Sequence, residues 1–323
     1  MTDPRRDDPH VTVVIAAWNA EATIVKAIES ALAQTVPVEV VVVDDRSTDE
    51  TRARAAALAE GEPRLTVLCQ TANGGPSAAR NRAIEASRAP WIAVLDSDDW
   101  MEPARLGRLL ELAERHGADF MADDLWKLDE GAPISERRRM LGDVTGPIPV
   151  TAAEFVAGNL SADHGNRREM GFLKPLMSRR FLKRHALRYD PGIRLGEDYV
   201  LYTRALLCGA VFMLTAPAGY VATVRPGSLS GRHPTEAHAD LVRADRIMLI
   251  REDLSPATRN ALEAHLMEHR KKWAWRRLID AVRDADPVAA LRCFWAPPQV
   301  ALDLFGRLSR EALARLRRRT GMG

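Results

Sequence analysis

The chain has 323 residues, of which 46% are hydrophobic and 28% are charged, and its formal net charge is +2. These values are ordinary for a globular protein, and so balanced a charge excludes binding of nucleic acid through bulk charge alone. The three cysteines have no metal-ligand or Cys-x-x-Cys spacing, which favours a reducing compartment. The chain has no apolar run of about 18 residues and a polar N-terminus, so we expect neither a membrane-spanning helix nor a signal peptide.

The N-terminal part of the chain alternates predicted strands with predicted helices. We expect residues 1–10 to form a disordered lead-in. Continuous β-branched runs indicate strands buried on both faces of a parallel sheet, and apolar residues at helical spacing indicate the helices between them. The strands are predicted at residues 11–17, 38–43, 65–68 and 91–95, and the helices at 21–34, 50–60 and 77–87. This alternation is typical of βαβ units, so we expect an α/β fold with a mostly parallel sheet flanked by helices.

Less regular segments follow. Residues 129–150 are rich in Gly, Pro and charge, and we expect an excursion or a flexible loop there, such as a lid. Thr151 and Glu154 have the spacing of a capping box. The remaining predicted elements are helices at residues 104–116, 151–160, 178–185 and 199–208, strands at 118–125, 210–214 and 219–224, and a crossing strand or loop at 171–177. From Pro234 onward the pattern is helical and rich in Arg. We therefore predict an α/β domain at residues 11–235 and a helical C-terminal region at 236–323.

An acidic loop follows the fourth predicted strand. Asp96, Asp98 and Asp99 come directly after the apolar run, at the strand's carboxyl end, which is where open α/β sheets bind ligands. Two carboxylates with Asp-x-Asp spacing can share a divalent cation that also binds phosphate oxygens. Without a cation, such clustered charges would raise one another's pKa. The alternative is that Asp99 is the N-cap of a helix that starts at Trp100.

Four stretches and a later Gly196-Glu197-Asp198 carry a family resemblance. The four stretches are residues 13–19, 43–49, 75–81 and 95–99. In this order they resemble the family 2 inverting glycosyltransferases with a GT-A fold, and most of all the succinoglycan-type exopolysaccharide transferases. The resemblance extends over roughly residues 10 to 230. It implies a Rossmann-like, mostly parallel sheet, here followed by a helical extension.

The resemblance implies a nucleotide-sugar site at the strand ends. Ala17, Trp18 and Glu21 would lie near the nucleotide, Asp45 would hydrogen-bond the base, and Arg80 would reach the nucleotide. A carboxylate accepts well from a uracil N3–H, which favours a uridine nucleotide. The alternative roles are helix capping for Asp45, together with Asp44, and a solvated helix arginine for Arg80.

Asp98 resembles the direct ligand of Mn²⁺ or Mg²⁺, and Asp96 would meet the ribose or the water shell of the metal. A cation there would neutralise the nucleoside diphosphate leaving group. Among the residues further along the chain, Arg225, Arg232 and His233 would bring positive charge to the diphosphate, and His233 would approach the metal.

Asp198 resembles the general base that accepts the proton of the acceptor hydroxyl, and Glu197 is the reserve candidate. The alternative is that both residues only favour the start of the following helix through its dipole. A Gln-x-x-Arg-Trp signature, which processive members carry, does not follow. The sequence therefore indicates single additions by an Asp-assisted single displacement.

The helical tail mixes cations with tryptophan. Residues 270–277 contain two Trp among Arg and Lys, and residues 315–319 form a second cationic stretch. Such helices suit an anionic membrane surface, where a polyprenyl-diphosphate-linked acceptor would lie. A solvated helical cap or a dimer contact is the alternative, and we expect no nucleic-acid partner. We expect a cytoplasmic protein, peripheral at the inner face of the membrane.

The combined prediction is a metal-dependent, inverting hexosyltransferase of exopolysaccharide biosynthesis. It would move a hexose from a UDP-sugar, such as UDP-glucose, to a carbohydrate acceptor. A nucleotidyltransferase would need a basic, Gly-rich loop after the first strand, and Trp18-Asn19-Ala20-Glu21 is not one. The other alternative is a sugar-nucleotide-binding regulatory module without turnover, against which the presence of Asp198 argues.

Overall fold

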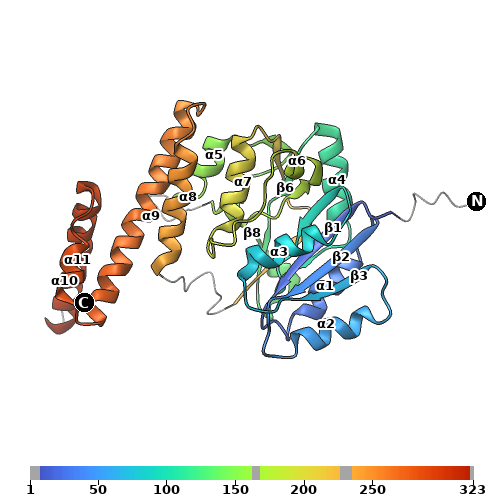
Figure 1. The fold of residues 1–323 in the computed structure, drawn as a ribbon, viewed down its shortest axis with the longest axis horizontal. Helices are drawn as coiled ribbons and strands as arrows, with labels where there is room; N and C mark the ends of the chain where they lie inside the picture. Colours follow the sequence, from blue (N-terminus) through green and yellow to red (C-terminus); the bar gives the residue numbers. More distant parts are fainter. Residues whose placement is uncertain (1–7, 162–167, 226–234, 321–323) are drawn as a thin grey trace, which may run out of the picture. The chain divides into compact units, whose positions relative to one another are not determined.

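A computed structural model describes residues 8–161, 168–225 and 235–320, without the side chains of residues 314–320. The chain divides into two compact units, Met1–Gly231 and Arg232–Gly323. The first unit contains the sheets, and the second is helical in its described part (Figure 1).

The first unit is built on an eight-stranded sheet with the order β3-β2-β1-β4-β10-β6-β11-β9. Its parallel half consists of β1 (Val11–Ala17), β2 (Val38–Asp44), β3 (Leu65–Cys69) and β4 (Trp91–Val94). The Val and Ile side chains of β1 are completely buried on both faces of the strand, as the sequence pattern predicts. This half confirms the predicted α/β fold and brings the carboxyl ends of β1, β2 and β4 to one edge.

Helices follow these strands along the chain and place small or apolar residues against the sheet. They are α1 (Ile24–Leu32), α2 (Thr51–Ala59), α3 (Gly75–Glu85) and α4 (Arg105–His116). In α1 the buried residues are Ile24, Ala27, Ile28 and Ala31, a single apolar stripe at helical spacing. The helix α4 ends at Gly117, whose φ of 60° is the left-handed conformation that glycine adopts without strain.

The later part of the first unit completes the sheet with strands of both directions. The strand β10 (Leu176–Ser178) lies antiparallel between β4 and β6 (Phe120–Asp123), and β11 (Phe212–Thr215) pairs parallel with β6. The helices here are α5 (Ala152–Ala157), α6 (Arg179–Arg184) and α7 (Glu197–Leu207), and η2 (Met170–Phe172) is a 3₁₀ turn. The predicted capping box is confirmed: Thr151 Oγ1 accepts from Glu154 N, and the Glu154 carboxylate accepts from Thr151 N.

Residues 129–150 form an excursion with short elements of their own, which the sequence pattern did not predict. These residues contribute β8 (Arg138–Arg139), a 3₁₀ turn η1 (Ile134–Glu136) and β9 (Ile148–Pro149), which joins the main sheet. The strand β8 belongs to a second, four-stranded sheet, whose order is β5 (Trp100–Met101), β12 (Tyr220–Val224), β7 (Trp126–Asp129) and β8. Two-residue strands have no periodicity, so only their pairing with distant segments defines them.

The second unit has four helices in its described part: α8 (Thr235–Leu249), α9 (Pro256–Arg283), α10 (Pro287–Arg292) and α11 (Pro298–Thr320). Ser255 and Asp286 cap α9 and α10 through their side chains. One small apolar cluster of this unit joins α9 to the α10–α11 hairpin and contains Ala274, Leu278, Cys293, Val300 and Leu304. None of the described helices is both long and apolar enough to span a bilayer.

Candidate active site

The loops after β1 and β2 interlock at the carboxyl edge of the sheet. Ala17 O accepts a hydrogen bond from Asp45 N at 2.8 Å. The Glu21 carboxylate accepts from Glu50 N at 3.0 Å, so it holds the start of the helix that follows β2. The Trp18 side chain is 47% exposed at this edge. The structure therefore brings the predicted nucleotide residues of these two loops together and leaves an open indole face beside them.

The carboxylate of Asp45 forms hydrogen bonds within the protein. Its carboxylate accepts from Gly74 N at 2.8 Å, Gly75 N at 2.7 Å and Gln70 Nε2 at 2.9 Å. Helix α3 begins at Gly75, so Asp45 caps a helix distant in sequence and fixes the turn that precedes Arg80. An ionised carboxylate has about four acceptor positions, so one remains for a ligand.

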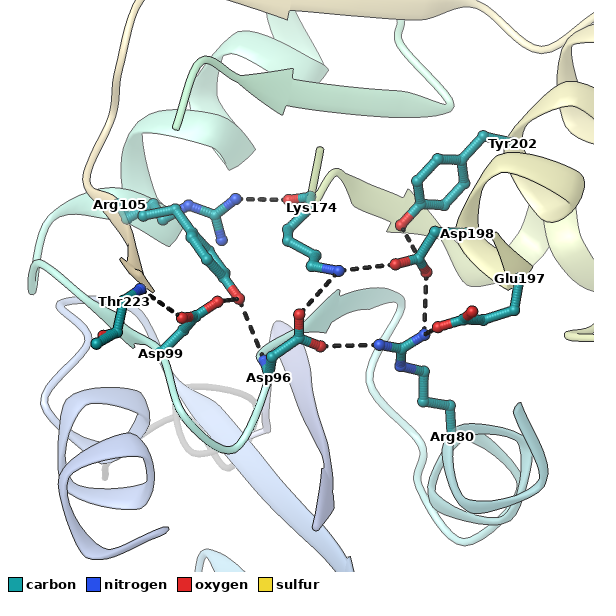
Figure 2. A network of polar contacts seen from close by, with 10 residues as sticks. Arg80, Asp96, Asp99, Arg105, Lys174, Glu197, Asp198, Tyr202 and Thr223 are labelled. Carbon is teal, nitrogen blue, oxygen red and sulfur yellow. Dashed lines mark hydrogen bonds and ion pairs between the residues drawn. The ribbon is translucent and has the colours of Figure 1, made fainter. Parts of the chain in front are cut away.

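Arg80 binds three carboxylates (Figure 2). Its guanidinium donates to Asp96 Oδ1 at 2.8 Å, Glu197 Oε1 at 2.7 Å and Asp198 Oδ1 at 3.2 Å. The side chain is buried and also lies over the ring of Tyr189. Arg80 is therefore not a solvated helix arginine. It joins the loop after β4 to the start of α7, although the two lie far apart in the sequence.

Lys174 is the site residue that the sequence analysis missed. Its buried ammonium group lies 2.7 Å from Asp198 Oδ2 and 3.0 Å from Asp96 Oδ2, so it bridges the two predicted functional carboxylates (Figure 2). Its backbone carbonyl accepts from Arg105, which in turn forms a completely buried ion pair with Asp123. A lysine inside the apolar run at residues 171–177 was the available signal, because lysines are rarely buried without a partner.

The network has a shortage of positive charge. Arg80 and Lys174 face Asp96, Glu197 and Asp198, so two cations meet three carboxylates. Burial opposes ionisation of Asp96, but the charges of Lys174 and Arg80 prevail and lower its pKa to about 2. Burial raises the pKa of Glu197, and the neighbouring Asp198 adds to this shift while Arg80 opposes it.

Residues of β12 fix the rest of the acidic loop through hydrogen bonds. Asp99 Oδ2 accepts from Tyr220 Oη and Asp99 Oδ1 from Thr223 N, both at 2.8 Å. The Tyr220 hydroxyl also accepts from Asp96 N, so this tyrosine fixes both ends of the Asp-x-x-Asp turn. The next helix begins at Arg105 with Ala104 as its N-cap. Asp99 therefore supports the loop and does not cap a helix.

Asp98 is the carboxylate of this loop that suits a cation best. Burial and the charge of Asp96 raise its pKa, and Arg225 and Lys174 only partly offset this. Both oxygens of Asp96 already meet Arg80 and Lys174. Within the described residues no cluster of three or more His, Cys, Asp or Glu side chains could enclose a metal ion. A cation at Asp98 would thus take its remaining ligands from diphosphate oxygens and water.

Asp198 lies in the first turn of α7, but its side chain does not cap that helix. The helix N-cap is Gly196, and Asp198 instead accepts from Lys174, Arg80 and, at 3.3 Å, the hydroxyl of Tyr202. Asp198 is therefore oriented from three sides. Among the described residues, Glu197 beside it has a single side-chain partner, Arg80.

The predicted diphosphate residues are described only in part. Arg225 directly follows β12 and forms an ion pair with Glu130 at 3.0 Å, and its charge acts on Asp98. Arg232 and His233 lie outside the described residues. An arginine is thus present beside the acidic loop at the point where the second sheet ends.

Solved structures share this arrangement of the sheet. Staphylococcus aureus TarS in complex with UDP aligns with a TM-score of 0.60 and 18% identity, over 87% of this chain and 88% of that chain. The mannosyltransferase PcManGT from Pyrobaculum calidifontis, in complex with GDP-Man and Mn²⁺, aligns with a TM-score of 0.54 and 20% identity, over 95% and 81%. The class of protein is therefore that of the GT-A fold, as predicted.

Sequence comparison gives the family. The model of Glycosyl transferase family 2 matches residues 12–148. The succinoglycan biosynthesis protein ExoU of Rhizobium meliloti (strain 1021) is 43% identical over 270 residues, which cover 84% of this chain and 78% of ExoU. ExoO of the same strain is 38% identical over 333 residues, which cover 98% and 89%. The chain belongs to glycosyl transferase family 2 and is a glycosyltransferase, which confirms the predicted family and enzyme class.

Proposed function

We propose that this enzyme transfers a hexose from a UDP-sugar, with UDP-glucose as the first candidate, to a growing exopolysaccharide of the succinoglycan type. One observation supports this most strongly: Arg80 and Lys174 join Asp96 of the acidic loop to the Glu197-Asp198 pair. A donor diphosphate at the loop and an acceptor hydroxyl at the pair would then meet at one sugar. The names of ExoU and ExoO, and the UDP and UDP-GlcNAc complexes of TarS, agree with it.

The chemistry assigns a separate task to each side of the network. Asp198 accepts the proton of the acceptor hydroxyl as its oxygen attacks the anomeric carbon. The bond between that carbon and the donor phosphate oxygen breaks on the opposite face, so the anomeric configuration inverts and a nucleoside diphosphate leaves. Glu197 is the second candidate for the base.

The donor side depends on the loops after β1, β2 and β4. Trp18 offers a face for the nucleobase, and Asp45 has one acceptor position left for it. Asp98 would hold Mn²⁺ or Mg²⁺, with Asp96 at the ribose or the water shell of the metal, and the ion when bound supplies charge neutralisation for the leaving diphosphate. Arg225, together with Arg232 and His233, is the proposed source of positive charge on the open side.

The acceptor is proposed to be lipid-linked, with the oligosaccharide on a polyprenyl diphosphate. This places the enzyme at the surface of a membrane through its C-terminal unit.

The alternative function is that of a sugar-nucleotide-binding module without turnover. It differs from the proposal in one measurable respect, the release of nucleoside diphosphate.

A donor panel tests the proposed activity. The enzyme with Mn²⁺ and a lipid-linked oligosaccharide fraction is incubated with UDP-glucose, UDP-GlcNAc or GDP-mannose, and nucleoside diphosphate release is followed. We expect release from UDP-glucose well above that from GDP-mannose, and a product whose proton NMR coupling reports a β-linkage from the α-linked donor. Release from GDP-mannose alone would reject the uridine assignment, and binding of a donor without any release would favour the regulatory module.

A further inference from the structure

The helical unit contains a pocket lined by four arginines. It has a volume of about 180 Å³ and lies where α9 meets the α10–α11 hairpin. The charged or aromatic side chains that line it are Arg246, Arg270, Arg277, Arg292, Trp273 and Trp295. No carboxylate of the described part of the chain is among its lining residues. The pocket therefore concentrates positive charge in a unit whose other cations are often paired with acids.

The pocket arginines differ from other arginines of the same unit in their ion pairing, although Arg277 also lines a neighbouring hollow that contains Glu236 and Asp280. None of the four forms an ion pair with a described residue, whereas Arg243, Arg251, Arg283 and Arg307 of the same unit all do. Burial and then the charge of Arg246 lower the pKa of Arg270, which is the signature of cations facing one another. Such an arrangement is unfavourable by itself and becomes favourable when an anion binds.

A hydrogen-bond donor in the pocket also needs an acceptor, as an anion would provide. The indole N–H of Trp273 is buried without an acceptor among the described residues. The Arg277 guanidinium lies over the Trp273 ring, 5.1 Å from its centroid, which holds both groups in the pocket wall. A phosphate group presents several acceptor oxygens and would satisfy arginine and indole donors together.

The hairpin beside the pocket exposes large apolar side chains. Trp295 is 89% exposed although it lines the pocket, and Leu291 and Leu302, from α10 and α11, are also exposed. Indole and leucine side chains next to arginines match the boundary between headgroups and acyl chains of a bilayer. A soluble anion such as free phosphate would need the arginines but would leave this apolar rim without a partner.

We propose that this pocket binds the phosphate of an anionic membrane lipid, with the α10–α11 hairpin inserted beside it at the headgroup level. The inference rests on the proposed function in that a lipid-linked acceptor would place the substrate at the same surface. It concerns the helical unit alone, so it can be tested without donor sugar or turnover.

Vesicle sedimentation of the full chain tests the proposal. We expect binding to vesicles with equal parts of phosphatidylcholine and phosphatidylglycerol, and little binding to phosphatidylcholine alone. Arg270→Gln should lower the partition coefficient about tenfold or more, because it removes a charge-assisted hydrogen bond to the bound phosphate, whereas general attraction of one cation to an anionic surface is worth only about fivefold. Lys271→Gln is the matched control, because it removes the same charge at the next position of α9 but does not line the pocket. Trp295→Ala should also weaken binding.

Two further readouts separate a binding role from a structural one. Arg270→Gln removes an uncompensated cation, so its melting temperature should equal or exceed that of the wild type, and its UDP affinity in titration should not change. Equal losses for Arg270→Gln and Lys271→Gln, or no vesicle binding by the wild type, would overturn the pocket assignment. Stabilisation by inorganic diphosphate without vesicle binding would assign a soluble anion, and tighter binding of an RNA oligonucleotide than of vesicles would assign nucleic acid.

Discussion

The Asp198→Asn enzyme is expected to bind UDP as the wild type does and to turn over about 10²- to 10⁴-fold more slowly, the usual contribution of a general base. Asn has the shape of Asp but only one oxygen, so it can accept either from Lys174, which donates to Oδ2, or from Tyr202 and Arg80, which donate to Oδ1. The donor loops after β1, β2 and β4 keep their own contacts. Asn cannot accept the acceptor's proton. The measurements are kcat from nucleoside diphosphate release and the UDP affinity from calorimetry.

Glu197→Gln is the matched control for this prediction. Glu197 is adjacent, binds the same arginine and loses the same charge on substitution. We expect its kcat to fall far less than that of Asp198→Asn. If Glu197→Gln shows the larger loss and Asp198→Asn is nearly unchanged, Glu197 is the base and Asp198 only orients Arg80 and Lys174.

Lys174→Met is expected to destabilise the fold by about 3–5 kcal/mol, because it leaves the buried Asp198 and the partly exposed Asp96 without one of their two cations. Met fills nearly the same volume, so the loss reports charge and not a cavity. The measurement is urea unfolding. Lys127→Met is the control, since Lys127 pairs with Glu169 at a partly exposed site and its removal should alter stability by at most about 1 kcal/mol.

A double variant isolates the cause. Adding Asp198→Asn to Lys174→Met removes one of the unpaired charges and should recover part of the lost stability.

The pH dependence of stability should agree with this role. Ionised Asp96 stabilises the fold above its ordinary pKa of 3.8, and this contribution is lost as pH falls toward about 2. In Lys174→Met the pKa of Asp96 should be higher than in the wild type. The free energy of unfolding of this variant should therefore begin to fall at a higher pH than that of the wild type. Equal effects of Lys174→Met and Lys127→Met would contradict the assigned role.

The parallel half of the sheet and its loops could be predicted from the sequence because their signals are local. The apolar strands of β1, β2 and β4 and the polar residues at their ends repeat within short windows, and βαβ connectivity then places those ends together. That logic located the acidic loop with Asp96, whereas Arg80 and Asp198 were identified through the resemblance to family 2 glycosyltransferases. It also predicted the capping box at Thr151, which needs only one helical turn.

The remaining features depend on contacts between distant segments. The sheet containing β5, β12, β7 and β8 joins residues far apart in the chain through strands as short as two residues. Lys174 gains its place from β10, which inserts antiparallel between β4 and β6. The capping of α3 by Asp45 likewise joins two loops that no sequence pattern connects.

Calorimetric titration with UDP, with and without Mn²⁺, on the wild type and on Asp98→Ala tests the central claim most directly. We predict that Mn²⁺ strengthens UDP binding to the wild type and that Asp98→Ala removes this gain, an affinity loss of at least about tenfold, or 1.4 kcal/mol. UDP binding that neither Mn²⁺ nor the substitution alters would contradict the assignment of the loop after β4 as the cation and diphosphate site.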